Sequence, residues 1–376
     1  MEKPTLLLMT SALNGASQSV IGDITEMAGA WQRSTRINGG FWLGSFVIED
    51  KISLLKSFFH DYKGAHLKEQ SAGVTTWEGM IYDMDLPDPP AESGEENSRL
   101  SVGVCGYAHT ASWRFVTTAT ATGAMANVSA WINDLVVNHC SDFLVIGQVD
   151  TNTLQVKRAL PRDMRAWEAI VDATMLGDAN ADPWCSYVDV GRRFYYKKID
   201  MAPIYWVRGG VTRRWSYDLM ANYVDGTFID ENNEVQPLAA VSQAQSIETH
   251  GRREEKIYMD TVPLTAAQKR RDFYLKENSW PWARGIGSID VQVETPSGEI
   301  ARNPWSVRPG VYRDMSYILG GADVGFWLPD ARDFLVEEVT CGVETGLSLS
   351  TWQFEESEQL AIQEEYRRWL ERQEEE

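Results

Sequence analysis

Two stretches near the start of the chain decide its fold: GFWLGSFVI at residues 40–48 and VTTWEGMIYDMDL at residues 74–86. In the first, turn glycines precede a run of aromatic and β-branched residues, which predicts a strand. The second mixes aromatic, β-branched and polar residues in near alternation, which predicts a half-buried strand. Between the two, apolar residues recur at helical spacing and predict a short helix over residues 48–62. The opening of the chain is therefore expected to form a strand–helix–strand unit.

Further helices are predicted wherever apolar side chains fall on one face of a helical repeat. Such a face is present in residues 124–139 and 162–176, and a narrower one in the charged residues 356–371. Residues 266–274 are a possible additional helix inside a polar region. All of these segments are short, so helix is expected to be the minor element of the fold.

Most other segments are rich in β-branched and aromatic residues and are separated by turn residues, which predicts strands. Residues 143–150 and 154–160 are expected to pair as a hairpin, and residues 100–107 are expected to pair with residues 112–120. The predicted fold class is therefore mainly β with short helices, an α+β chain.

Composition and charge exclude several classes of function. With 43% hydrophobic and 24% charged residues, the 376-residue chain is expected to fold into several modules. No segment approaches the roughly 20 apolar residues that span a bilayer, and no secretion signal is recognised. The chain has 35 basic and 54 acidic residues, a net charge of −19. This sign disfavours specific binding of nucleic acid but suits a conduit that DNA passes without sticking.

The reactive residue types do not form a recognised catalytic or metal-binding motif. The four cysteines, Cys105, Cys140, Cys185 and Cys341, lack C-x-x-C spacing and are expected to be reduced and buried, as suits a reducing cytoplasm. The five histidines form no H-E-x-x-H pair, and the chain has no G-x-S-x-G elbow and no phosphate-binding loop. We therefore expect no enzyme activity, no cofactor and no metal.

Two carboxylate arrangements are weighed as exceptions to that expectation. Trp77 followed by Glu78 could act as a sugar platform with a general acid, although a strand residue of no catalytic role is the more common outcome. Asp83, Asp85 and Asp88 could offer oxygen ligands to calcium, but they lack the spacing of an EF-hand loop.

The order of these segments resembles that of tail-tip, or baseplate hub, proteins of tailed bacteriophages. GGFWLGSFVI, the helix ISLLKSFFHDYKG, the strand TTWEGMIYDMDL and the strand LSVGVCGY follow one another as they do in that family. AWEAIVDATMLGD with RRFYYKKID is similar to the family's inserted module. NPWSVRPGVYRDM and DFLVEEVTCGVETGLSLST are similar to its last β module. The resemblance spans residues 38–355.

The resemblance implies tail-tube-like β-barrel modules and an inserted α/β module. In that family the hub forms a ring, usually trimeric, that continues the tail tube and carries tip or fibre proteins. The resemblance implies that the chain is a virion protein of the tail tip, made in the host cytoplasm and not associated with a membrane. Its implied partners are the neighbouring tail-tube, distal tail, and tip or fibre proteins. The implied division is residues 1–120 and 285–355 as tube-like modules, 121–195 as the insertion, 196–284 as a connecting region and 356–376 as a charged helix.

The same resemblance gives the tryptophans and some acidic residues candidate roles. Tryptophans beside turn residues are candidates for burial between subunits, with burial inside one subunit as the alternative: Trp42, Trp77, Trp305 and Trp327. Acidic residues are candidates for the ring's inner wall, with solubility of the outer surface as the alternative: Glu78, Asp83, Asp85, Glu337 and Glu338. A carbohydrate-binding or glycan-degrading tail protein is the rival function, and a surface adhesin is a weaker third.

Overall fold

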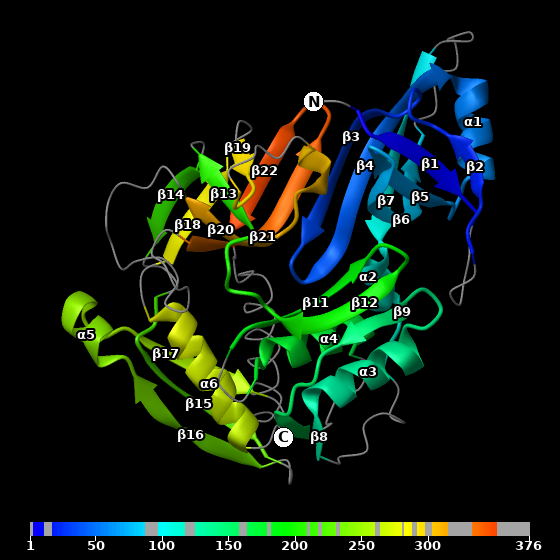
Figure 1. Ribbon diagram of the computed structural model, residues 1–376. Helices are drawn as coiled ribbons and strands as arrows, with labels where there is room; N and C mark the ends of the chain where they lie inside the picture. The colour runs from blue at the N-terminus through cyan, green and yellow to red at the C-terminus, as the bar shows by residue number, and fades with distance from the viewer. Residues whose placement is uncertain are drawn as a thin grey trace, which may run out of the picture.

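The computed structural model describes residues 3–10, 17–86, 97–116, 125–157, 164–178, 182–208, 211–216, 220–230, 234–259, 264–279, 282–287, 292–297, 303–314 and 333–351. Strands dominate these residues, and the helices between them are short, as the sequence predicts (Figure 1). The predicted helix over residues 356–371 and Trp327 lie outside the described residues.

The first part of the chain forms one strongly curved antiparallel sheet with the strand order β2-β1-β5-β6-β7-β4-β3. Helix α1 follows β4 inside the range predicted for it, and it buries Leu55 and Phe58 against the sheet. The elements are β1 (Thr5–Met9), β2 (Val20–Asp23), β3 (Gly29–Arg36), β4 (Gly39–Lys51), α1 (Ile52–Asp61), β5 (His66–Ser71), β6 (Val74–Asp85) and β7 (Asn97–Gly106).

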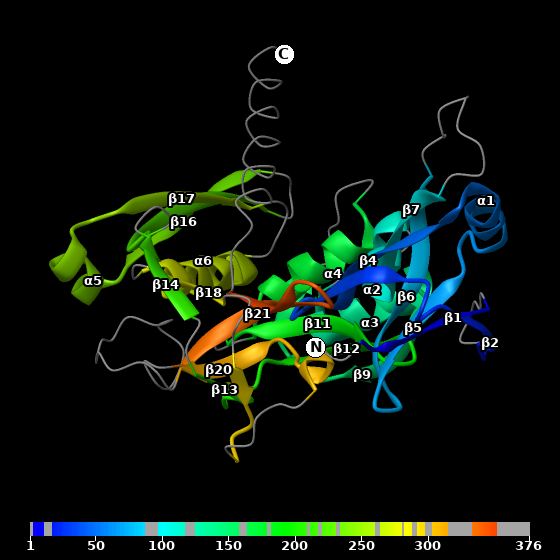
Figure 2. The ribbon, with the colours of Figure 1, turned by 90° about the horizontal axis from the view of Figure 1, so that it is seen from above.

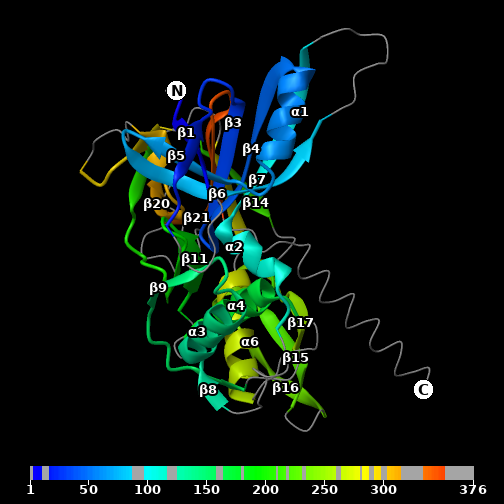
Figure 3. The same ribbon diagram turned by 90° about the vertical axis from the view of Figure 1, so that its right-hand side faces the viewer.

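A smaller α/β unit follows directly after β7. Helices α3 and α4 pack against the strands β11, β12 and β9 and against each other, and α2 lies between this unit and the first sheet (Figure 3). The elements are α2 (Tyr107–Thr110), η1 (Ala111–Trp113), β8 (Met125–Asn127), α3 (Val128–His139), β9 (Val145–Val149), β10 (Gln155–Lys157), α4 (Ala166–Met175), β11 (Trp184–Asp189) and β12 (Arg193–Lys198). Both predicted helices of this region are confirmed.

Two predicted strand pairings in this unit are wrong. β9 pairs in parallel with β12, and β10 pairs with β8, so the described part of the expected hairpin, residues 143–157, does not pair with itself. β7 pairs with β4 and β6 on its two edges rather than with residues 112–120, and residues 107–113, expected in part as strand, form α2 and η1. The reason is tertiary: Tyr107, Ala108 and Ala111 are buried in the core shared with α3 and α4, and this packing outweighs local β propensity.

The region after β12 contains a second small unit held between two strands. β14 pairs with β18 over its whole length, and the chain between them forms the sheet β16-β15-β17 with α6 across one face (Figure 2). Helix α6 includes the possible helix expected over residues 266–274. The elements are β13 (Tyr205–Arg208), β14 (Val211–Ser216), β15 (Tyr223–Ile229), β16 (Val235–Ser242), α5 (Ala244–His250), β17 (Glu254–Met259), α6 (Leu264–Asn278), β18 (Trp282–Gly287) and β19 (Gln292–Glu294).

The end of the described chain returns to the first sheet. The last elements are η2 (Pro304–Ser306), β20 (Gly310–Asp314), β21 (Asp333–Gly342) and β22 (Gly346–Thr351). One edge of β21 pairs first with β20 and then with β3, while its other edge pairs with β22. Trp31, Phe41 and Trp77 therefore share one continuous core with Trp305 and Val339, although hundreds of residues separate them in the chain.

The α/β unit also meets the first sheet through a very close backbone contact. Gly40 of β4 lies beside Val188 of β11 in a short parallel pairing, with a φ of 71°. A side chain at Gly40 would overlap the carbonyl oxygen of Val188. Only glycine combines this φ with so little space.

We predict that Gly40→Ala destabilises the protein far more than Gly64→Ala. Gly64 has nearly the same φ, 68°, but open space around it, so its replacement costs only the left-handed strain of about 1–2 kcal/mol. Gly40→Ala adds overlap with β11, which costs about 1–3 kcal/mol more. Urea unfolding of both variants measures the difference, and equal losses of stability would contradict the close contact.

Candidate functional site

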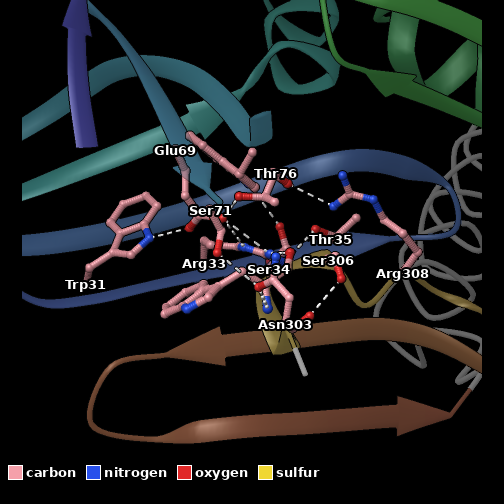
Figure 4. A network of polar contacts seen from close by, with 12 residues as sticks. Trp31, Arg33, Ser34, Thr35, Glu69, Ser71, Thr76, Asn303, Ser306 and Arg308 are labelled. Carbon is pink, nitrogen blue, oxygen red and sulfur yellow. Dashed lines mark hydrogen bonds and ion pairs between the residues drawn. The ribbon is translucent and has the colours of Figure 1, made fainter. Parts of the chain in front are cut away.

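A charged pair lies fully buried in the core where the first sheet meets the end of the chain. Arg33 of β3 and Glu69 of β5 are 3.4 Å apart (Nε to Oε1), and both side chains are 0% exposed (Figure 4). Glu69 also accepts hydrogen bonds from the indole N–H of Trp31 and the hydroxyl of Thr76. A buried ion pair is tolerated only when its remaining polar atoms are satisfied in this way.

The same network holds the segment around η2. The Arg33 guanidinium donates to the backbone carbonyl of Trp305, and the Ser71 hydroxyl donates to Asn303 Oδ1 at 3.0 Å. The sequence separation of these partners exceeds two hundred residues, so the network fixes the return of the chain rather than a local turn.

Arg308 extends this network to all three parts of the structure. Its guanidinium donates to the carbonyl of Thr76 at 2.8 Å, lies 4.9 Å from the ring centre of Phe41, and is 3.9 Å from Asp189 of β11. Burial, and next the neighbouring Arg33, lower the pKa of Arg308 from its ordinary value. A guanidinium nevertheless remains charged in proteins, so Arg308 can hold its hydrogen bond and ion pair at this junction at any ordinary pH.

A second buried polar cluster joins the first sheet to the turn between β11 and β12. Glu78 Oε1 accepts the backbone N–H of Arg192 at 2.8 Å, and burial raises the pKa of Glu78 despite this bond. His66 Nδ1 lies 2.6 Å from the hydroxyl of Tyr107 and 2.5 Å from the amide of Gln18. Burial, and next the charge of Arg192, lower the pKa of His66 to about 4.

The structure places the candidate tryptophans mostly inside the chain. Trp77 and Trp305 are 0% and 1% exposed and belong to the main core, so neither offers surface to a second subunit, and the interface prediction does not hold for them. Trp42 is half-buried, between Arg36 and His109, and stays a candidate.

The acidic candidates also divide. Glu78 is 3% exposed and bonded to a turn, so it cannot face a channel, which corrects that part of the prediction. Asp83 and Asp85 are exposed on β6, and they stay candidates. Glu337 and Glu338 are half-buried on β21, where Glu338 pairs with Arg36 at 3.3 Å. Trp77 and Glu78 are thus both buried and do not form a sugar-binding pair.

The described residues offer little reactive chemistry. Nowhere among them do three or more His, Cys, Asp or Glu side chains lie in a position to hold a metal ion. All four cysteines are free and buried, and burial raises the pKa of each thiol to about 12, so they are not thiolates at neutral pH. Within the ranges described, no helix is long and apolar enough to cross a membrane. The buried clusters can position chain segments, and this is the role their geometry supports.

Sequence reasoning missed the residues that form these junctions. Arg33 occupies an inward position of β3 between Trp31 and Thr35, and a charge at an inward position of an otherwise core-facing row is the signal that could have singled it out. Its partner, Glu69, and the contact with Trp305 depend on tertiary pairing and leave no mark on the sequence.

Comparison with solved structures finds the same fold in prophage tail proteins. The 43 kDa tail protein of prophage MuSo2 from Shewanella oneidensis aligns with a TM-score of 0.57 at 12% identity, covering 93% of this chain and 98% of that one. A tail protein from Neisseria meningitidis aligns with a TM-score of 0.56 at 12% identity, and the alignment covers 93% of this chain and 96% of that one. Prophage tail protein gp18 from Listeria monocytogenes aligns with a TM-score of 0.53 at 8% identity, and the alignment covers 94% of this chain and 97% of that one.

No protein-family model matches the sequence, and no curated protein matches it at a significant level. The similarity to the tail proteins is therefore one of fold, and it extends over nearly the whole chain. The chain has the mainly β fold of phage tail proteins, as the resemblance of its segments implies.

We predict that Glu69→Gln destabilises the protein by about 3–5 kcal/mol, because it leaves the guanidinium of Arg33 buried without its counter-charge. The matched control is Glu338→Gln, which removes the partner of the more exposed Arg36 and should cost about 0–1 kcal/mol. Chemical denaturation of both variants tests this, and similar losses for the two would show that burial of the first pair is unimportant.

We predict that acid weakens the fold through His66. Its pKa is about 4 in the fold against an ordinary 6.5, so the unfolded chain binds the proton more tightly. The contribution of His66 to stability is therefore complete above pH 6.5 and is lost as the pH falls to 4. Glu78, whose pKa is raised, opposes this trend, and the pKa values of His109 and His139 are also lowered.

The control His66→Gln isolates the effect, because it keeps a polar side chain but removes the titrating group. Melting temperatures measured between pH 4 and pH 7 should fall less steeply in His66→Gln than in the wild type. Parallel curves for the two proteins would exclude His66 as the source.

Proposed function

We propose that this protein is a structural component of a phage tail tip, a baseplate hub whose copies form a ring that continues the tail tube and anchors tip or fibre proteins. The observation that carries the proposal is the extent of the fold correspondence, which covers 93% of this chain and 96–98% of two bacterial tail proteins. The proposed place of action is the tail of the virion, after synthesis in the host cytoplasm.

The internal architecture supports a structural role. A tail component has to keep its shape while neighbouring proteins are attached to it. Here the first sheet, the α/β unit and the end of the chain converge on Arg33, Glu69 and Arg308, and the main core contains residues from both ends of the described chain. Close-packed interiors transmit strain rather than absorb it.

The proposed module division follows the resemblance of the sequence. Residues 1–120 and 285–355 are proposed as two tube-like modules, and a trimer of such chains would match a sixfold tube. The shared strand β21, which pairs with β3 on the first sheet and with β22, would fix the two modules relative to each other. Residues 121–195 and 196–284 would then project from the modules as the inserted and connecting units.

The net charge of −19 supports passage of DNA rather than its binding. We propose that Asp83 and Asp85 belong to the inner wall of the ring, because both are exposed on the same strand and neither has a role in the core. The neighbouring strand β7 places Gly103 and Ser101 opposite them, neither of which carries a charge. An acidic wall makes contact with phosphates unfavourable.

The purified protein should form trimers in solution and rings in electron micrographs, and it should show no turnover of cell-wall or capsule glycans. Light scattering coupled to size-exclusion chromatography measures the mass, and negative-stain images show the shape. A chain that stays monomeric at every concentration would contradict the ring, and release of reducing sugars from a glycan would favour the rival function.

A further inference from the structure

Exposed aromatic side chains gather where the first sheet meets the α/β unit. Tyr82 of β6 is 49% exposed, Trp113 of η1 is 40% exposed and Phe115 is 50% exposed. The ring of His109 lies 6.0 Å from the ring of Tyr82 and 6.4 Å from that of Trp113, and Phe115 follows Trp113 by two residues. Leu43, 38% exposed, lies opposite Cys105 of β7, and Cys105 lies opposite Met80, two residues before Tyr82 on β6. We call Leu43, Tyr82, Trp113 and Phe115 the aromatic patch.

A second apolar surface lies at the edge of the first sheet. β2 pairs with β1 on one side, and among the described residues no strand pairs with its other side. Val20 and Ile21 are 57% and 48% exposed and, as neighbours on a strand, point to opposite faces. Met27, 44% exposed, follows in the next turn. We call Val20, Ile21 and Met27 the edge patch. An unprotected apolar edge strand is a template for another chain.

The register of the sheet separates the two patches. Val20 lies opposite Met9, Met9 opposite His66, His66 opposite Met80, Met80 opposite Cys105, and Cys105 opposite Leu43. These are five strand steps, a path of about 24 Å along the sheet at 4.8 Å per step. The middle of this row is covered, because Tyr107 packs on His66. The patches are therefore two distinct surfaces on either side of α2.

The charges around the two patches differ, because only carboxylates flank the edge patch, whereas guanidinium groups as well as carboxylates lie around the aromatic patch. Asp23 and Glu26 are exposed beside the edge patch. Arg165 lies over the ring of Phe115 in the aromatic patch, and Arg114 is adjacent, paired with Asp142. Two edge patches brought together would place four carboxylates in one contact, which disfavours self-pairing. An edge patch against an aromatic patch instead brings carboxylates toward guanidinium groups.

From this arrangement we infer that the edge patch of one copy of the chain docks on the aromatic patch of the next copy. Such a contact joins different surfaces, so a pair of copies retains one free patch of each kind, and repetition closes a ring when the rotation between successive copies is a whole fraction of a turn. The inference rests on the proposed ring and names the surfaces that build it. The contact buries the apolar edge of β2. It also places the exposed aromatic side chains at the centre of the interface, where Trp and Tyr are commonly found.

The test uses one variant for each patch. Val20→Ser with Ile21→Ser changes the edge patch, and Tyr82→Ser with Phe115→Ser changes the aromatic patch; all four side chains are more than a third exposed. Glu26→Lys with Met27→Lys is a second edge variant that leaves β2 itself unaltered. Val235→Ser, at a 47% exposed valine of β16 outside both patches, is the matched control. Circular dichroism and thermal melting confirm that each variant is folded.

Masses are then measured for each variant alone and for an equimolar mixture of an edge variant with the aromatic variant. We expect each variant alone to be monomeric, the control to assemble like the wild type, and the mixture to stop at a dimer. In the mixture only one contact is possible, between the intact edge patch of one chain and the intact aromatic patch of the other.

The other outcomes overturn the inference in distinguishable ways. If one variant alone forms dimers, its intact patch pairs with itself. If both variants form the wild-type ring, the ring uses other surfaces and the proposed function stands without this contact. If the wild type itself is monomeric, both the proposed ring and the proposed contact are contradicted.

Discussion

The ion pair between Arg33 and Glu69 is the constraint on which the rest of the structure depends. Two charges removed from water are costly, and their mutual attraction offsets this cost only when every other polar atom of the pair is also bonded. Here those bonds come from Trp31, Thr76 and the carbonyl of Trp305, which lie on three separate segments. The segments must therefore be correctly placed together, because any one of them in the wrong place leaves a buried charge unsatisfied.

This requirement connects local packing to the proposed role. A core made of residues from both ends of the described chain cannot open at one of these ends without disturbing the other. Arg308 adds the α/β unit to the same junction through Asp189, and Glu78 adds the turn after β11. The interior is thus occupied by positioning contacts, and the surfaces that we propose for partners are the edge patch, the aromatic patch and the exposed residues of β6.

Periodicity and turn residues predicted the local elements because their causes are local. Residues 48–62, 124–139 and 162–176 each contain the helix expected there, since apolar side chains at helical spacing give a helix one face to bury. The possible helix at residues 266–274 was likewise confirmed within α6. The order of the β segments along the chain was enough to indicate the tail-protein fold. This order can be compared between sequences without knowing which strands pair.

The sequence by itself determined the mainly β class, the positions of the short helices and the acidic balance, all of which depend on neighbouring residues or on composition. Only the tertiary structure decided which strands pair and which side chains are buried. β9 pairs with β12 instead of its neighbour in sequence, and Trp77, Glu78 and Trp305 lie inside the chain rather than on a surface. The physical reason is that pairing and burial are properties of residues distant in sequence, whose contacts form only when the whole core assembles.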